Sequence, residues 1–317
     1  MSLEERTGHR AAWRSLIGRL SRPLPPRSFG VTLGSVAIFL ILVQAATGAL
    51  LAVYYTPAWD EARASVLRIS KDVTFGWLVR SIHVWSAHLL VATVLLHLVR
   101  TFARGSYAKP REATWLAGVA LLGVIMGAAF TGQMLPMDDE AVKGAEVAGA
   151  YASQMGLSEV VKGGVNVGPP TLTRMFAAHV IWVPAGLILL IAAHLSLVAR
   201  HRLQGAESLE GSSPQFPRLI GLSVLAAAAL VATLAFAFPA GIGPAPNEGA
   251  GSAKPLWPFL SVYQAAKFVS GPWTIPLLVG PPLFLIAVPF LPRRVAVAAG
   301  ALLFAAAVAF GIWGAVS

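Results

Sequence analysis

The chain has 317 residues, of which 56% are hydrophobic and only 12% are charged. Soluble domains carry about 25% charged residues, so this composition leaves too little polar surface for a water-soluble globule and predicts a membrane protein. The net charge of +10 does not indicate nucleic-acid binding, because the basic residues are spread between apolar runs. Cysteine is absent, which excludes disulfides, iron–sulfur clusters, thiolate zinc sites and thioether-attached haem held by this chain itself.

Residues 1–30 are polar and rich in arginine, with Trp13, Leu16, Ile17 and Leu20 at helical spacing. We expect a short amphipathic segment on the cytoplasmic membrane surface. A disordered basic tail is the alternative that this composition leaves open. No cleavable signal peptide is evident in this stretch.

Seven apolar segments follow, each long enough or nearly long enough to cross a bilayer, which takes about 20 residues. They cover residues 31–55, 78–101, 114–135, 173–199, 218–238, 273–291 and 295–316. The sequence therefore predicts an all-α fold, a polytopic transmembrane bundle of about seven helices. The Gly-, Ser- and Pro-rich stretch 203–217 looks like a linker, which divides a four-helix first part (31–203) from a three-helix second part (204–317).

The loops between these segments alternate in charge. One set carries Arg100, Arg104, Lys109, Arg111, Arg200, Arg202, Arg218, Arg293 and Arg294, and the other carries most of the Asp and Glu residues. Because basic loops stay in the cytoplasm, we expect the N-terminus inside a bacterial inner membrane and the C-terminus outside. The two long loops, 136–170 and 239–272, then lie on the outer face, where we expect function.

Four histidines are the candidate metal ligands. His83 and His97 are fourteen residues apart on the second segment, and His179 and His194 are fifteen apart on the fourth. Either spacing is close to four helical turns, so each pair projects from roughly one helix face at two levels about 21 Å apart. We expect His83 to face His179 and His97 to face His194, because both segments run inward.

Two imidazoles on opposite sides of an iron satisfy the axial positions of a haem, so the pattern predicts two haems stacked within the first four-helix bundle. The alternative is that the four histidines are polar contacts inside the bundle, but ionisable residues within a membrane span are costly and usually functional. A fifth histidine, His88, lies between the two levels and is interpreted as packing or a local hydrogen bond.

Glycines and arginines fit the same arrangement. Gly34 and Gly48, and likewise Gly118 and Gly132, are fourteen residues apart on the flanking segments, which favours clearance for a haem edge over ordinary small-residue packing. Two further candidates for cofactor binding are Arg80 and Arg100, whose guanidinium groups would suit haem propionates. For Arg100 a basic cytoplasmic flank is the alternative.

These residues resemble the cytochrome b/b6 family, nearer to its b6 branch. The matching motifs are LVQAATG with Gln44 and Gly48, RSIHVWSAH with Arg80 and His83, HLVR with His97 and Arg100, KPREATW at 109–115, Leu135-Pro136, TLTR at 171–174, and His179, Pro184 and His194. The second part is similar to the family's separate subunit IV, with KPLWPFLSVYQ at 254–264 in the place of a PEWY-containing stretch.

The resemblance implies two non-covalent b-type haems and quinol oxidation near the outer face. One electron would pass to a Rieske-type iron–sulfur protein and on to a c-type cytochrome, and the other would pass through the haems to an inner quinone site, with protons released outside. It also implies a homodimer within a multi-subunit complex surrounded by lipid.

Three positions depart from the family pattern. Leu256 stands in place of the PEWY glutamate that is thought to take a proton from quinol, and Met137 replaces a tryptophan. Thr32 replaces the cysteine that tethers an extra haem, which leaves only a non-covalent haem at the inner face open. Asp138, Asp139 and Glu140 are the candidate replacements for the glutamate; an acidic solvated loop is their alternative interpretation.

Two other functions stay open at this point. The first is a di-haem, quinone-reactive membrane anchor of another respiratory enzyme without electron bifurcation, which the missing glutamate favours. The second is a non-redox transporter, which broken helices and midplane charges would indicate; the spans show no such charges besides the histidines.

Overall fold

The computed structural model describes residues 29–204, 216–246, 254–269 and 271–317, and every regular element in these ranges is a helix. The all-α fold class is therefore confirmed. Residues 1–28 of the expected amphipathic segment, and residues 205–215 of the expected linker, lie outside the described residues.

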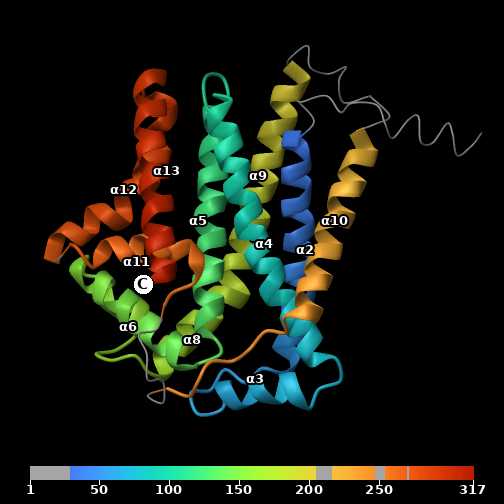
Figure 1. Cartoon of the computed structure of the whole chain (residues 1–317), viewed down its shortest axis with the longest axis vertical. Helices are drawn as coiled ribbons and strands as arrows, with labels where there is room; N and C mark the ends of the chain where they lie inside the picture. Colours follow the sequence, from blue (N-terminus) through green and yellow to red (C-terminus); the bar gives the residue numbers. More distant parts are fainter. Residues whose placement is uncertain (1–28, 205–215, 247–253, 270) are drawn as a thin grey trace, which may run out of the picture.

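Six helical segments in the described ranges are long and apolar enough to cross a membrane. They are α2 (Phe29–Tyr54), α4 (Gly76–Ala103), α5 (Glu112–Met134), the continuous run of α8 (Pro169–Ala177), the π-helical turn η1 (Ala178–Trp182) and α9 (Val183–Gln204), then α10 (Phe216–Ala237) and α13 (Arg293–Val316). They extend along the long axis of the molecule (Figure 1). The chain is thus a multi-pass membrane protein.

The segment expected at 273–291 differs from the other spans. It forms the shorter helix α12 (Thr274–Ala287), followed by a single 3₁₀ turn, η5 (Val288–Phe290). Fourteen residues of α-helix rise about 21 Å, which is less than the hydrocarbon thickness of about 30 Å. Pro281 and Pro282 are accommodated inside α12 although each lacks an N–H donor, and the α-helix ends just before Pro289, which lies in η5.

Short helices cover the end of the bundle that the charge pattern assigns to the outer side. α3 (Ala62–Lys71) follows α2, while α6 (Asp139–Gln154) and α7 (Ser158–Lys162) follow α5. α3 and α6 lie toward the lower end of the molecule in Figure 1. The long loop expected at 136–170 is therefore largely helical.

The second part of the chain packs into the first. α10 lies against α2 and α4, and the central core cluster joins Leu40, Val91, Ile125 and Val231 from these helices and α5. At the opposite side α11 (Leu260–Ala266) packs against α13, and Gly300 of α13 leaves room for the Phe102 ring of α4. Both parts therefore share apolar surface.

Candidate functional site

The outer histidine pair comes from α4 and from the π-helical turn. The ring centroids of His83 and His179 lie 6.3 Å apart, with their planes inclined at 76°. Two metal–imidazole bonds of about 2 Å each separate the two ligating nitrogens by about 4 Å. The observed ring separation leaves room for one metal ion between the imidazoles.

Two threonines fix the hydrogen positions on these rings. The hydroxyl of Thr47 donates to the Val43 carbonyl at 2.6 Å, so its oxygen accepts from Nδ1 of His83 at 2.9 Å. Thr131 repeats the arrangement, with 2.8 Å to the Gly127 carbonyl and 3.1 Å to Nδ1 of His179. When Nδ1 carries the hydrogen, the Nε2 lone pair is available to a metal.

The π-helical turn accounts for the unequal spacing of the two histidine pairs. The backbone N–H of Val183 donates to the Ala178 carbonyl, five residues back, and this wide turn contains His179. Pro184 follows directly, and its ring clashes with a carbonyl four residues earlier in a regular α-helix. The π turn contains one residue more than an α-helical turn. His179 and His194, fifteen residues apart, therefore lie on nearly the same helix face, as His83 and His97 do with fourteen residues in α4.

Each of the four predicted glycines faces one histidine. A Cβ atom on Gly132 would lie 2.7 Å from Cε1 of His179, and one on Gly48 would lie 3.2 Å from Cε1 of His83. At the inner level the corresponding distances are 3.4 Å from Gly118 to His194 and 4.0 Å from Gly34 to His97. The glycines at the outer level thus let two flanking helices approach the imidazoles closely.

The inner pair is less fully bonded than the outer pair. Nδ1 of His194 donates to the Thr114 carbonyl at 3.1 Å, which again leaves Nε2 with a lone pair. Nδ1 of His97 is buried without a hydrogen-bond partner in the described residues, as is the Thr114 hydroxyl. Buried polar groups are rarely left unpaired, so these two atoms indicate a group that belongs at this level.

The predicted arginines lie in different settings. Arg80 is buried, and its guanidinium donates to the carbonyls of Ala240 and Gly241 at 2.5 and 2.6 Å. It therefore holds the segment after α10 against the outer end of α4. Arg100 lies three residues after His97, in the last turn of α4, and is half-buried.

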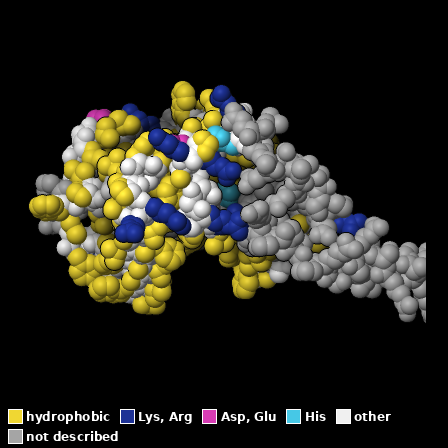
Figure 2. All heavy atoms as spheres, turned by 90° about the horizontal axis from the view of Figure 1, so that it is seen from above, with side chains coloured by type: hydrophobic (Ala, Val, Ile, Leu, Met, Phe, Trp, Pro, Cys, Tyr) yellow, Lys and Arg dark blue, Asp and Glu magenta, His cyan; other side chains and the backbone are white. Residues whose placement is uncertain are grey.

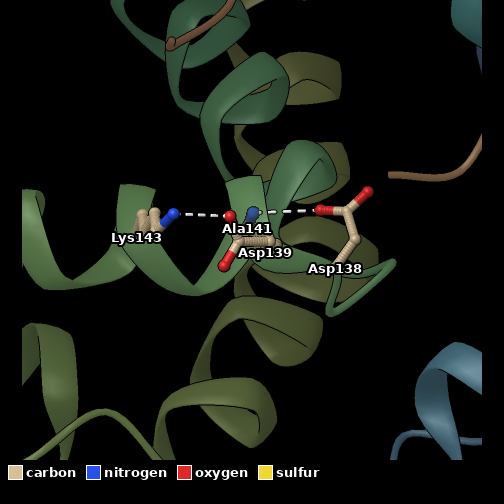
Figure 3. A network of polar contacts seen from close by, with 4 residues as sticks. All are labelled: Asp138, Asp139, Ala141 and Lys143. Carbon is tan, nitrogen blue, oxygen red and sulfur yellow. Dashed lines mark hydrogen bonds and ion pairs between the residues drawn. The ribbon is translucent and has the colours of Figure 1, made fainter. Parts of the chain in front are cut away.

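Two of the three predicted acids take part in structural contacts at the start of α6. Oδ1 of Asp138 caps the helix by accepting from the Ala141 amide at 3.0 Å, and Oδ2 of Asp139 pairs with Lys143 at 2.6 Å (Figure 3). The second oxygen of Asp138 accepts from the Gly243 amide at 3.0 Å. Glu140 is exposed, and partial burial, then the charges of Asp138 and Asp139, raise its carboxyl pKa.

Sequence reasoning left the surroundings of His88 unspecified, and here the structure adds a contact. The indole Nε1 of Trp257 donates to Nδ1 of His88 at 3.1 Å, and the Trp85 ring lies 5.6 Å away. The interpretation of His88 as a group with a local hydrogen bond agrees with this geometry. Sequence reasoning also missed Thr47 and Thr131, although both directly precede a predicted glycine.

The donor set fits a bis-imidazole haem. Opposed imidazoles at two levels, with Nε2 available on three of the four rings by their hydrogen bonds, match two axial ligands per iron. Glycines against the rings leave space beside them, and the apolar bundle excludes water. Such a site leaves no axial position open and therefore suits electron transfer over oxygen binding.

Comparisons with known proteins give one family and several relatives. The model of the cytochrome b/b6/petB family matches residues 22–202. The cytochrome bc complex cytochrome b subunit of Chlorobaculum thiosulfatiphilum is 38% identical over 256 residues, which cover 76% of this chain and 60% of that protein. Cytochrome b6 of Heliobacterium mobile is 37% identical over 190 residues, covering 58% of this chain and 88% of that protein.

A chain of a hyperthermophilic respiratory Complex III has a similar fold, with a TM-score of 0.77 at 24% identity over 99% of this chain and 90% of that one. The match to the Chlorobaculum relative spans only 60% of that protein's length.

Proposed function

This chain belongs to the cytochrome b/b6 family, and we propose that it is the di-haem cytochrome b subunit of a Rieske-type quinol:cytochrome c oxidoreductase. Family membership implies that it binds b-type haem. The observation that carries the proposal is the His83–His179 pair, whose ring separation of 6.3 Å accommodates one iron. We assign His97 and His194 to a second haem at the inner level.

The chain's own residues hold and orient these groups. Thr47 and Thr131 keep the hydrogens of the outer imidazoles on Nδ1, so Nε2 is presented to the iron. When bound, each haem accepts and donates one electron. Two levels about 21 Å apart then give electrons a path through a layer that excludes free charge. Residues 31–203 form the haem part and residues 204–317 the part similar to subunit IV.

The outer face is the proposed site of quinol oxidation, and a quinone site lies near the inner haem. Glu140 stands at the outer end of the bundle, where its raised pKa suits a group that passes protons to water. Asp138 and Asp139 remain candidates for the same role only if their structural contacts are released. Thr32 is buried near the inner end of α2, so a further haem there would have to be non-covalent.

The proposed function requires redox partners that this chain does not contain. The chain has no cysteine, so a Rieske-type iron–sulfur centre and a c-type cytochrome must reside on other subunits. We propose a homodimer within such a complex, surrounded by lipid. The relative named as a cytochrome b subunit of a bc complex supports a multi-subunit assembly.

The charge distribution supports a bacterial inner membrane with the N-terminus in the cytoplasm. Viewed from above, the upper end of the molecule carries many Lys and Arg side chains and few Asp or Glu (Figure 2). The exposed cations Arg104, Lys109, Arg200 and Arg293 belong to the loops and helix ends expected there. Basic loops are retained on the cytoplasmic side during insertion.

A second candidate function rests on one observation. Leu256 cannot accept a proton, and it stands where the family carries its glutamate. A membrane anchor with two haems, exchanging electrons with quinone at one site only, would not need that acid. Inhibitor-sensitive quinol oxidation at the outer site by the purified complex would exclude this alternative.

Haem content tests the proposal directly. We expect His83→Ala and His194→Ala each to lower the ratio of b-type haem to protein by about half in reduced-minus-oxidised spectra, because each histidine is one of two axial ligands. The matched control is His201→Ala, since His201 lies at the inner end of the same helix as His194 and outside both pairs. Unchanged haem content in both pair variants would refute the assignment.

A further inference from the structure

The proposed outer quinol site lacks an evident proton acceptor on the segment where the family has one. Leu256, which directly precedes the 3₁₀ turn η3 (Trp257–Phe259), has a hydrocarbon side chain that cannot accept a proton. Asp138 is held by the Ala141 and Gly243 amides, and Asp139 by Lys143. A quinol bound beside η3 must therefore give its proton to a group from another element.

His88 of α4 is the ionisable side chain that meets this turn. It lies five residues beyond His83, which places it about 7.5 Å deeper along α4 and still in the outer half of the span. The residue after Leu256, Trp257, makes the hydrogen bond to it at 3.1 Å. An ionisable group inside a membrane span is costly to keep and is expected to have a function.

The direction of this hydrogen bond identifies the reactive nitrogen. An indole N–H can only donate, so Nδ1 of His88 is the acceptor and points its lone pair toward η3. In the neutral ring the hydrogen then resides on Nε2. The imidazole can accordingly take a proton on the side of η3 and release one on the other side.

The same turn also contacts α5, at nearly the depth of the outer histidine pair. The ring of Phe259 packs edge-on against Phe130 of α5, with centroids 6.3 Å apart. Phe130 is two residues before Gly132, which faces His179. η3 therefore contacts both α4 and α5, and its contact on α5 lies about 3 Å along the helix axis from the level of Gly132. The Trp257 side chain is 42% exposed, so its displacement opens no buried core.

We propose that His88 is the base that takes one of the two protons from quinol at the outer site, with Trp257 holding its Nδ1 until quinol binds. This proposal rests on the proposed function. The quinol hydroxyl replaces the indole at Nδ1, its O–H bond breaks, and the proton passes to the imidazole. The two electrons leave for one-electron acceptors, the iron–sulfur centre of a partner subunit and the outer haem, and the second hydroxyl proton goes to the outer aqueous phase.

The first test compares His88→Ala with the control His201→Ala in the intact complex. Loss of a general base slows its reaction by about 10²–10⁴-fold, so we expect His88→Ala to lower kcat for inhibitor-sensitive quinol oxidation by about 10²-fold or more, with haem content and both haem spectra unchanged. His201→Ala should keep the parent rate. A His88→Ala complex that keeps its haems and the parent rate overturns the proposal.

A second variant separates a chemical role from a structural one. Leu256→Glu in the His88→Ala background puts a carboxylate at the neighbouring position, and we expect it to recover most of the lost rate. The recovered activity should show a different pH profile, because a carboxylate and an imidazole titrate in different ranges. No recovery, in a complex with full haem content, would mean that His88 acts through packing.

A third variant examines the indole. Trp257→Phe keeps an aromatic ring but removes the donor that competes with quinol for Nδ1. We expect KM for quinol to fall while kcat stays within about twofold of the parent. Equal losses of kcat in Trp257→Phe and His88→Ala would show that the pair serves only as a structural unit.

Measurements on the parent complex distinguish a failure of the proposed function from a failure of the proposed role of His88. If it contains both haems but shows no inhibitor-sensitive quinol oxidation, the proposed function fails and the role of His88 fails with it. If it oxidises quinol and His88→Ala does so equally well, only the role of His88 is lost.

Discussion

At the scale of single residues, the outer site depends on two Thr-Gly pairs. Thr47 and Gly48 on α2 serve His83, and Thr131 and Gly132 on α5 serve His179. In each pair the threonine orients the imidazole by a hydrogen bond and the glycine lets the helix approach it. The two functions need different side chains at adjacent positions, so neither residue can take over the role of the other.

Gly132 is the most constrained of these positions. A methyl group there would come within 2.7 Å of His179, so the imidazole or α5 must move. Overpacking of this kind costs about 1–3 kcal/mol, and here it also displaces a ligand. We expect Gly132→Ala to lower the content of the outer haem, measured by redox titration of the haem spectrum.

The matched control for that variant lies on the same helix. A Cβ atom on Gly123 meets nothing within 4 Å, so Gly123→Ala should keep both haems. The helix-propensity gain of Gly→Ala, about 1 kcal/mol, is the same in both variants and cancels in the comparison. Equal haem contents in the two variants would show that the close approach at Gly132 is not needed.

At the scale of elements, the fourth span brings both of its histidines into the bundle because one turn within it, between α8 and α9, is π-helical. Fifteen residues of regular α-helix overshoot four turns by about 60°, whereas fourteen fall short by about 40°. The π-helical turn at Ala178–Trp182 absorbs the extra residue, so His179 and His194 reach both levels of the bundle. Such turns are frequent at functional sites.

Deleting one residue tests this account. Removal of Ile181 together with Pro184→Ala shortens the span within the π turn, so a regular helix can restore the spacing of fourteen. We expect that variant to keep more than half of its haem. Removal of Ile188 with Pro184 kept retains the cause of the π turn and rotates His194 by about 100°, so that variant should lose the inner haem. Equal haem loss in both variants would contradict the role of the π turn.

The sequence predicted the spans and the ligand candidates far better than it predicted the connections. Long apolar runs and histidines spaced by about four turns are local signals, so α2, α4, α5 and α9 were expected close to their observed places. The π turn, the contact of Trp257 with His88 and the binding of Arg80 to the Ala240 carbonyl depend on residues distant in the chain. α12 is shorter than expected because the α-helix ends just before Pro289 of η5, whereas the apolar run continues to Leu291.

At the scale of the whole molecule, the segment after α10 fastens the second part of the chain to the first. The Phe238 and Ala240 carbonyls accept from Trp85 and Arg80 of α4, and the Ala240 amide donates to Ser81. Further along, the Pro244 carbonyl accepts from the Asp139 amide. The segment crosses the lower end of the molecule as an extended strap beneath the bundle (Figure 1).

Because these contacts are independent of the covalent linker, we expect a chain cut within 205–215 to reassemble. Pieces 1–210 and 211–317, produced together in one membrane, should copurify through a tag on either piece and show the haem spectrum of the intact protein. The apolar contacts of α10 with α2 and α4, and the bond from the Trp115 indole to the Leu285 carbonyl, hold the pieces at two separate places.

Weakening the contacts of residues 238–246 should show how much this segment contributes to the association of the two pieces. Asp138→Asn keeps one side-chain oxygen, which can still accept from the Ala141 amide. The second carboxylate oxygen, which accepts from the Gly243 amide, is replaced by an NH₂ group that cannot accept. A hydrogen bond to a charged group contributes about 1.5–3 kcal/mol, so the cut variant should lose copurified partner by about tenfold or more on dilution in detergent. Asp139→Asn is the control, because its partner Lys143 lies on the same helix and does not join the two pieces. Equal losses in both variants would show that the bond from the Gly243 amide to Asp138 contributes no more to the association than an ion pair within α6.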